Sequence, residues 1–250
     1  MGSILQYFNL PNSCYFGNNI PKKMFYDNGS LSTADKKLFI DTINKITLNN
    51  QLNEQTINIK SYKDGIRSYE EIAFITINLS EEKKYKRIAQ IVQQTIPYPI
   101  VLLLECDSKT LINVCHKRTN QADSTKNTIE EHYFASWLDM EALETNEEQF
   151  LKSLNVPFLS HANFYNFYND FVDRVILYKA SRYATDFNSI KDMEVNKVNQ
   201  ILHQIELIDF DIISLRNKIK NEVHFNKKME MNMEIKKLDD TRRKLIGCLQ

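Results

Sequence analysis

The sequence predicts an α+β protein: an N-terminal, mostly antiparallel sheet with helices on one side, then an all-helical C-terminal region with a coiled-coil helical hairpin. β-Rich segments bounded by turn residues are confined to the chain before residue 140. After residue 141, apolar residues recur every three or four positions, which is the spacing of one helix face. The 250 residues include 5 glycines and 5 prolines, and this low content also favours long helices. We therefore expect an α+β domain at 1–140, a helical connector at 141–190 and the hairpin at 191–250.

The first sixty residues combine an aromatic arm, a capped helix and a short strand. Residues 1–30 hold too many aromatic side chains for a free tail, so we expect an ordered arm that lies over the core. Ser32 and Asp35 have the spacing of a capping box, and the apolar positions that follow, up to Ile46, form one helical stripe. Residues 56–60 alternate between polar and apolar side chains, which predicts a strand.

The central stretch has the most regular strand pattern. Residues 71–79 are β-rich, and Ser80 followed by two glutamates predicts a helix that runs to about residue 95. Residues 100–104 are apolar without interruption, as in a strand buried on both faces. The remaining strands are expected at 110–117, after a hairpin loop at 107–109, and at 131–138.

A helix beginning near Ser160 is predicted by five apolar residues at helical spacing: Phe164, Phe167, Phe171, Val175 and Tyr178. The aromatic run at 164–168 could stack nucleic-acid bases. Because its spacing places the aromatic rings on one helix face, packing in the core is the favoured interpretation.

Two heptad series follow this helix. The first is Ile201, Ile205, Ile208, Ile212, Leu215 and Ile219. The second is Met231, Ile235, Leu238, Leu245 and Leu249, with Arg242 in the remaining slot. The phase breaks between the two series, so either the chain reverses near Asn226 into an antiparallel hairpin or a stutter lets one helix continue. We expect the hairpin, and we expect the seam from Ile201 to Leu245 to bind a larger protein or a second copy.

The charge is balanced in total and uneven along the chain. The 32 basic and 32 acidic residues argue against a chain coated with basic side chains and against an acidic disordered chain. Residues 141–215 carry 6 basic and 12 acidic groups, whereas residues 216–250 carry 10 basic and 5 acidic groups. The basic excess pairs with the acidic stretch, or it docks an acidic partner or nucleic acid.

Several classes of site are not expected. The glycines are isolated from one another, which argues against a phosphate-binding loop and against kinases, ATPases and dinucleotide-binding proteins. Cys106, Cys115, His116 and His132 have zinc-ligand chemistry, but their positions on the predicted strands do not converge, so we expect no metal and no cofactor. The chain has no segment long enough to span a membrane and no signal peptide, and its four cysteines lack CxxC spacing. We therefore expect a cytoplasmic, reduced protein without a membrane partner.

Two alternatives to a non-catalytic role stay open. Glu105, Asp107 and Lys109 resemble the acidic residues and lysine of a metal-dependent nuclease, although a polar turn has the same composition. Direct binding of nucleic acid would use two basic clusters. Those clusters are His116, Lys117 and Arg118 on a predicted strand, and Arg242, Arg243 and Lys244 in the last helix.

A series of short motifs spans nearly the whole chain. Those in the first sixty residues are Phe8-Asn9-Leu10-Pro11, Ile20-Pro21-Lys22-Lys23, Leu31-Ser32 with Asp35-Lys36, and Gln55-Thr56-Ile57-Asn58-Ile59. Those in the middle and the end are Ile96-Pro97-Tyr98-Pro99-Ile100, His116-Lys117-Arg118, and Glu222-Val223-His224-Phe225-Asn226-Lys227-Lys228 followed by Asn232. In this order they resemble the bacterial domain-of-unknown-function 4391 family, whose typical length the chain shares.

The resemblance implies a biological setting and no catalytic residues. Members of that family are often encoded beside helicases and DNA methyltransferases of restriction-like anti-phage systems. It therefore implies a non-catalytic accessory subunit of a DNA-acting defence complex, with a helicase or methyltransferase as the larger partner and with DNA contacted through that complex.

Overall fold

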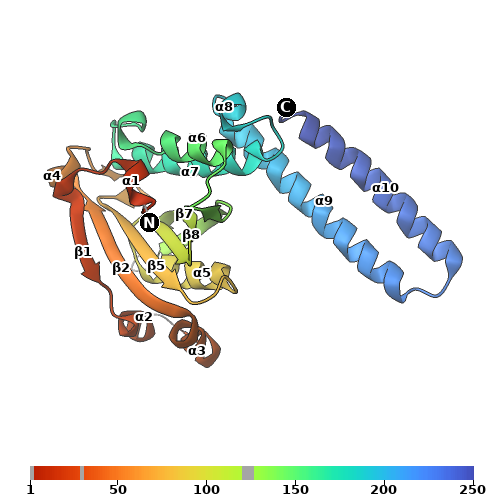
Figure 1. Cartoon of the computed structure of the whole chain (residues 1–250), viewed down its shortest axis with the longest axis horizontal. Coiled ribbons are helices and arrows are strands. Elements are labelled where there is room, and N and C mark those ends of the chain that lie inside the picture. Colours follow the sequence, from red (N-terminus) through yellow and green to blue (C-terminus); the bar gives the residue numbers. More distant parts are fainter. Residues whose placement is uncertain (1–2, 29–30, 120–126) are drawn as a thin grey trace. The chain divides into compact units, whose positions relative to one another are not determined.

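A computed structural model describes residues 3–28, 31–119 and 127–250 (Figure 1). The chain divides into two compact units, one formed by Met1–Val175 and the other by Ile176–Gln250. The expected boundaries at 140 and 190 do not coincide with this division, because helices that follow residue 141 pack with the sheet. We describe each unit by itself.

The first unit is built on a sheet with the strand order β1-β2-β5-β6-β7-β8, in which β9 also pairs with β7. The strands are β1 (Tyr15–Asn19), β2 (Ile43–Leu52), β5 (Ile72–Leu79), β6 (Ile100–Cys106), β7 (Lys109–Thr119), β8 (Asn127–Phe134) and β9 (Leu138–Asp139). Neighbouring strands are antiparallel except β5 and β6, which are parallel. Two short strands, β3 (Tyr62–Lys63) and β4 (Ser68–Tyr69), form a separate pair. The predicted α+β class with a mostly antiparallel N-terminal sheet is confirmed.

Helices cover both faces of this sheet, whereas the sequence predicts helices on one face only. The helices of the unit are α1 (Leu5–Phe8), η1 (Asn12–Cys14), α2 (Lys22–Asn28), α3 (Thr33–Thr42), α4 (Glu54–Ile57), α5 (Tyr85–Thr95), α6 (Thr145–Ser153), η2 (Val156–Phe158) and the first part of α7 (Phe164–Ser181). On one face, Ala73, Ile75 and Ile77 of β5 join a core with Ile88 and Val92 of α5. Because side chains alternate along a strand, the intervening residues of β5 point to the opposite face.

That opposite face holds an aromatic core. Phe74 of β5 lies 5.3 Å from Phe8 and 5.6 Å from Phe171 between ring centroids, and all three side chains are buried. Phe171 belongs to α7, and the Tyr168 hydroxyl on the same helix donates to the carbonyl of Ile100 in β6 at 2.8 Å. The aromatic stripe of α7 is therefore core, as predicted, and it binds the helix to the sheet.

Two segments near the N-terminus differ from the prediction. Residues 43–52 form strand β2, whereas the apolar spacing in the sequence places Ile43 and Ile46 in the preceding helix. The pairing of β2 with β5 shifts register between Ile43 and Lys45 and again between Leu48 and Asn50, so the strand lacks an alternating pattern in the sequence. The capping box of Ser32 and Asp35 is confirmed at the start of α3.

The predicted strand at 56–60 is wrong. The Asn53 side chain accepts from the backbone N–H groups of Gln55 and Thr56, which caps the one-turn helix α4. Asn58 then ends that turn in the left-handed conformation. The predicted arm at 1–30 is ordered over its described residues and includes β1, an edge strand that pairs with β2.

The second unit contains the end of α7, the short helix α8 (Phe187–Ile190) and two long helices, α9 (Val195–Asn221) and α10 (Phe225–Gly247). α9 and α10 pack together, and Figure 1 shows the chain reversing between them at residues 222–224. Arg242 Nε of α10 donates to Asp209 Oδ1 of α9 at 2.7 Å, so this bridge joins the two helices. The turn lies before Asn226, the residue favoured for it, which is the second residue of α10.

Among the residues that the structure describes, no helix is both long enough and apolar enough to cross a membrane.

Candidate functional site

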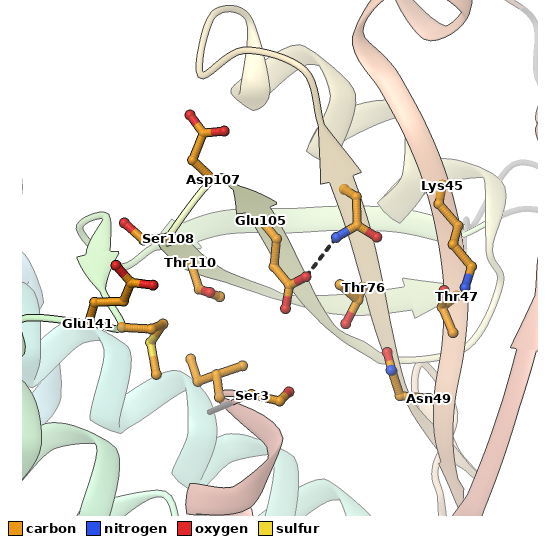
Figure 2. Close-up of a pocket in the computed structure, with 13 residues that line it drawn as sticks. Ser3, Lys45, Thr47, Asn49, Thr76, Glu105, Asp107, Ser108, Thr110 and Glu141 are labelled. Carbon is orange, nitrogen blue, oxygen red and sulfur yellow. Dashed lines mark hydrogen bonds between the residues drawn. The ribbon is translucent and has the colours of Figure 1, made fainter. Parts of the chain in front are cut away.

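A polar cavity of about 360 Å³ lies on the sheet of the first unit, where the parallel strands β5 and β6 end (Figure 2). Its lining comes from four neighbouring strands and from three segments that border them. The lining residues are Ser3, Ile4, Lys45, Thr47, Asn49, Thr76, Asn78, Glu105, Asp107, Ser108, Thr110, Met140 and Glu141. The carboxyl ends of parallel strands are a common location for ligand sites, because the backbone leaves a crevice there.

The strand register places Glu105 at the centre of this cavity. Asn78 of β5 is paired with Glu105 of β6, and the Asn78 Nδ2 group donates to Glu105 Oε2 at 2.7 Å. Thr76 lies two residues before Asn78 and therefore faces the same side of the sheet. Figure 2 shows the side chains of Glu105 and Thr76 directed toward the same space. Burial raises the pKa of Glu105, and the hydrogen bond from Asn78 opposes part of that rise.

Several groups around Glu105 can form further polar contacts. Thr76 and Thr110 are buried polar side chains of the lining. Asn49 Oδ1 is buried and has no hydrogen-bond partner among the described residues. The charged groups of the lining are Lys45 and three carboxylates, from Glu105, Asp107 and Glu141. The lining of the cavity therefore offers several hydrogen-bond acceptors, and it carries more negative than positive charge.

Glu105, Asp107 and Lys109, the residues at this hairpin that resemble a nuclease site, do not form one cluster. Cys106 pairs with Lys109, so the turn consists of Asp107 and Ser108, one residue shorter than expected. The Lys109 ammonium donates to Glu82 at 2.8 Å. Across the described residues, no group of three or more histidine, cysteine, aspartate or glutamate side chains is placed to hold a metal ion.

The basic cluster on β7, one of the two clusters that direct binding of nucleic acid would use, is largely interior. Lys117 is 3% exposed, and its ammonium donates to the carbonyls of Ile96 at 2.8 Å and Tyr98 at 2.7 Å. His116 is also buried, and its Nδ1 lies 2.6 Å from the Tyr69 hydroxyl. Burial lowers the pKa of Lys117 to about 8 and also lowers the pKa of His116. Arg118 is exposed, so within this cluster it is the side chain that a phosphate could reach.

The second basic cluster, in α10, lies in part between the helices. Arg242 is half-buried and paired with Asp209, whereas Arg243 is exposed and paired with Asp240 at 2.9 Å. Lys244 is exposed. The bridge to Asp209 agrees with the interpretation in which basic residues of the last helix pair with the acidic stretch.

The heptad seam lies within the helix pair. Ile201, Ile205, Ile212 and Leu215 of α9 are buried, and Ile208 and Ile219 are half-buried. On α10, Met231, Ile235, Leu238 and Leu245 are half-buried, and no residue of this helix is fully buried. Of the ten seam residues predicted to bind a partner, four are thus buried and six are half-buried, so none of them is left as a fully exposed apolar side chain.

Two outer stripes of apolar residues remain exposed on the helix pair. The α9 stripe is Leu207, Phe210 and Ile213, and the α10 stripe is Phe225, Met229 and Met233. At about 100° per residue, each stripe lies roughly opposite the seam of its own helix. Phe210 is 70% exposed and Phe225 is 72% exposed. The heptad seam does not reveal these stripes, although their three- and four-residue spacing is visible in the sequence.

The fold defines an α+β protein with a mostly antiparallel sheet and a C-terminal pair of long helices. The model of the family described as Domain of unknown function (DUF4391) matches residues 8–241, so the chain belongs to this family. No curated protein matches the chain. No solved structure matches it either.

Proposed function

We propose that this protein is a non-catalytic interaction subunit that docks a larger protein through the outer stripes of α9 and α10. In this proposal the seam forms a coiled-coil hairpin within the chain, and the outer stripes bind the partner. The observation that carries the proposal is the exposure of Leu207, Phe210 and Ile213 on α9 and of Phe225, Met229 and Met233 on α10.

Exposed apolar side chains arranged along a helix are typical of a surface that another protein covers. Scattered single apolar residues on a surface need no explanation, but two stripes at helical spacing on one helix pair form a pattern. Aromatic and methionine side chains are also enriched at protein interfaces. Phe210, Phe225, Met229 and Met233 supply both types.

The charge around the α10 stripe favours a different protein over a second copy of this chain. Beyond Met233, the exposed charged residues of α10 are Glu234, Lys236, Lys237, Asp240, Arg243 and Lys244, so basic groups outnumber acidic ones by four to two. Two copies that met through this face would bring like charges together, which is unfavourable. A partner with an apolar groove and an acidic rim would complement the face.

The DUF4391 membership supplies the setting of the proposal. As a member of that family, the protein would act as an accessory subunit of a restriction-like anti-phage complex that acts on DNA. The partner would then be a helicase or methyltransferase encoded beside it, and DNA would be contacted through the complex. This part of the proposal rests on family context and on no residue of the chain.

The test is co-expression of the full chain with each protein encoded beside its gene, followed by affinity purification. We expect one of these proteins to co-purify with the wild-type chain. Phe210→Glu and Met229→Glu place a charge in each outer stripe, and we expect either variant to lose the partner. Phe158 is 67% exposed in the first unit, so Phe158→Glu is the matched control and should retain it.

Two outcomes would contradict the proposal. One is that no neighbouring protein co-purifies with the wild-type chain. The other is that Phe210→Glu and Met229→Glu bind as well as Phe158→Glu. Light scattering on the purified chain decides the remaining alternative, because a stable dimer that either outer-stripe variant dissociates would assign the stripes to a second copy.

A further inference from the structure

The lining of the polar cavity is unusual for the face of the sheet on which it lies. Phe74 of β5 belongs to this face and packs in the aromatic core. The next two residues of β5 on the same face are polar, namely Thr76 and Asn78. In β6, the buried Leu103 is followed on this face by Glu105. Polar groups at such positions cost free energy unless they are hydrogen-bonded, so their presence calls for a role other than packing.

Some hydrogen-bond acceptors of the lining have no donor among the described residues. Asn78 donates to one carboxylate oxygen of Glu105, and no described residue donates to the other. Asn49 Oδ1 is also buried without a donor among the described residues. Asp107 and Glu141 also line the cavity, and Figure 2 shows the Asp107 carboxylate directed away from Glu105. A buried acceptor without a donor costs about 1–3 kcal/mol, which a ligand that donates hydrogen bonds would recover.

We propose that this cavity binds a small organic cation that carries a primary ammonium or guanidinium group, held by Glu105 and Asn49. The charged group donates to the second oxygen of Glu105 and to Asn49 Oδ1, while Thr76 and Thr110 line the space beside it. This ligand site is separate from the outer stripes, so it can be correct or wrong independently of the proposed docking.

Size and charge agree with this class of ligand. A volume of about 360 Å³ lies within the range of small-molecule pockets, and a diamine or an alkylguanidine fits within it. With three carboxylates and one lysine, the lining attracts cations. A phosphate or a carboxylate would face the Glu105 carboxylate without a matching donor cluster, since Lys45 is the only cationic side chain among the described residues of the lining. A cation would also favour the charged form of Glu105, which burial alone disfavours.

The experiment is isothermal titration calorimetry of the full chain with putrescine and with agmatine at pH 7.5. The controls are 1,4-butanediol, which matches putrescine in shape without charge, and MgCl₂ and inorganic phosphate. Glu105→Gln keeps the size of the side chain and its contact with Asn78 but removes the charge, and Asn49→Ala removes the second acceptor. Glu81→Gln, at an exposed position outside the lining, is the matched control.

We expect one of the two cations to bind saturably and 1,4-butanediol not to bind. We expect Glu105→Gln to weaken binding by about 10- to 100-fold and Glu81→Gln to leave it unchanged. Should Glu105→Gln fail to fold, Asn49→Ala is expected to weaken binding by about 10-fold. The proposal is overturned if neither cation binds, if 1,4-butanediol, Mg²⁺ or phosphate binds in their place, or if the cavity variants bind like Glu81→Gln.

Discussion

The central strands of the sheet and the last helix bury their side chains to opposite extents. In β5 and β6, residues on both faces are buried, with Asn78 and Glu105 as the half-buried exceptions. In α10, which has 23 residues, no side chain is fully buried, and Phe225, Met229 and Met233 are exposed. The strands contribute mainly to the stability of their own unit, whereas α10 keeps apolar surface that is available to a partner.

This contrast also separates the two kinds of charged residue in the chain. Lys117 lies inside the first unit, with its ammonium bound to two backbone carbonyls. The basic residues of α10 lie at its surface or bridge to α9, as Arg242 does. Nearby positions in a sequence motif can therefore have different roles, and burial decides which residues stabilise the fold and which are free to bind.

The largest expected difference in the free energy of unfolding is between substitutions of two phenylalanines, Phe74 and Phe210. Phe74→Ala removes a fully buried ring that contacts Phe8 and Phe171, and we expect it to lower the free energy of unfolding by about 3–5 kcal/mol. Phe210→Ala in the α9 stripe should change stability by less than about 0.5 kcal/mol. Urea denaturation followed by circular dichroism measures both. A cost for Phe210→Ala equal to that of Phe74→Ala would show that the outer stripe is a core.

A second comparison uses the neighbours Lys117 and Arg118. We expect Lys117→Met to lower the free energy of unfolding by about 1–3 kcal/mol, because the carbonyls of Ile96 and Tyr98 lose their charged donor. Arg118→Met, at an exposed position, should cost less than about 0.5 kcal/mol. The fluorescence of Trp137, the single tryptophan, reports unfolding of this unit. Equal costs would contradict the structural role of Lys117.

The pH dependence of the stability difference between the wild type and Lys117→Met gives an independent test. The pKa of Lys117 is lowered by burial to about 8 from an ordinary value near 10.5. Between these values the unfolded chain holds the proton that the folded chain has released, so stability rises with pH. The stability of the wild type relative to Lys117→Met should therefore increase as pH rises from about 8 to about 10. A constant difference over this range would be inconsistent with a lowered pKa.

The smallest effect is expected for the bridge within the helix pair. Arg242 and Asp209 are part-exposed, and a double-mutant cycle of Arg242→Ala and Asp209→Ala should give a coupling of about 0.2–1 kcal/mol. Thermal unfolding followed by circular dichroism measures each variant. A coupling above about 2 kcal/mol would mean that the helix pair depends on this bridge more than its exposure suggests.

Much of the sheet could be predicted because its strands carry strong local patterns. The segment at 71–79 is β-rich and the segment at 100–104 is a continuous apolar run, and they form β5 and β6. Strand β2 could not be predicted in the same way, since its two register shifts remove the alternation that identifies a strand. Helices on both faces were missed because tertiary packing, which a local pattern does not specify, decides where α5 and α7 lie.

The candidate sites were less predictable than the fold. The sequence singled out Glu105, but the partners that define its cavity, Asn49 and Asn78, come from strands distant in sequence and carry no motif. The seam was recognised by its period, and its residues are buried or half-buried on α9 and α10, two helices that pack together. The exposure of Phe210 and Phe225 depends on which face of each helix is covered, which heptads alone do not determine.

Hydrogen–deuterium exchange of the full chain, alone and with the neighbouring protein that co-purifies with it, tests the central claim most directly. If the outer stripes dock that partner, amide exchange should slow in residues 205–215 of α9 and 225–235 of α10 and stay unchanged in the central strands β5 and β6. Slowing confined to the sheet unit, with no change in α9 and α10, would contradict the account.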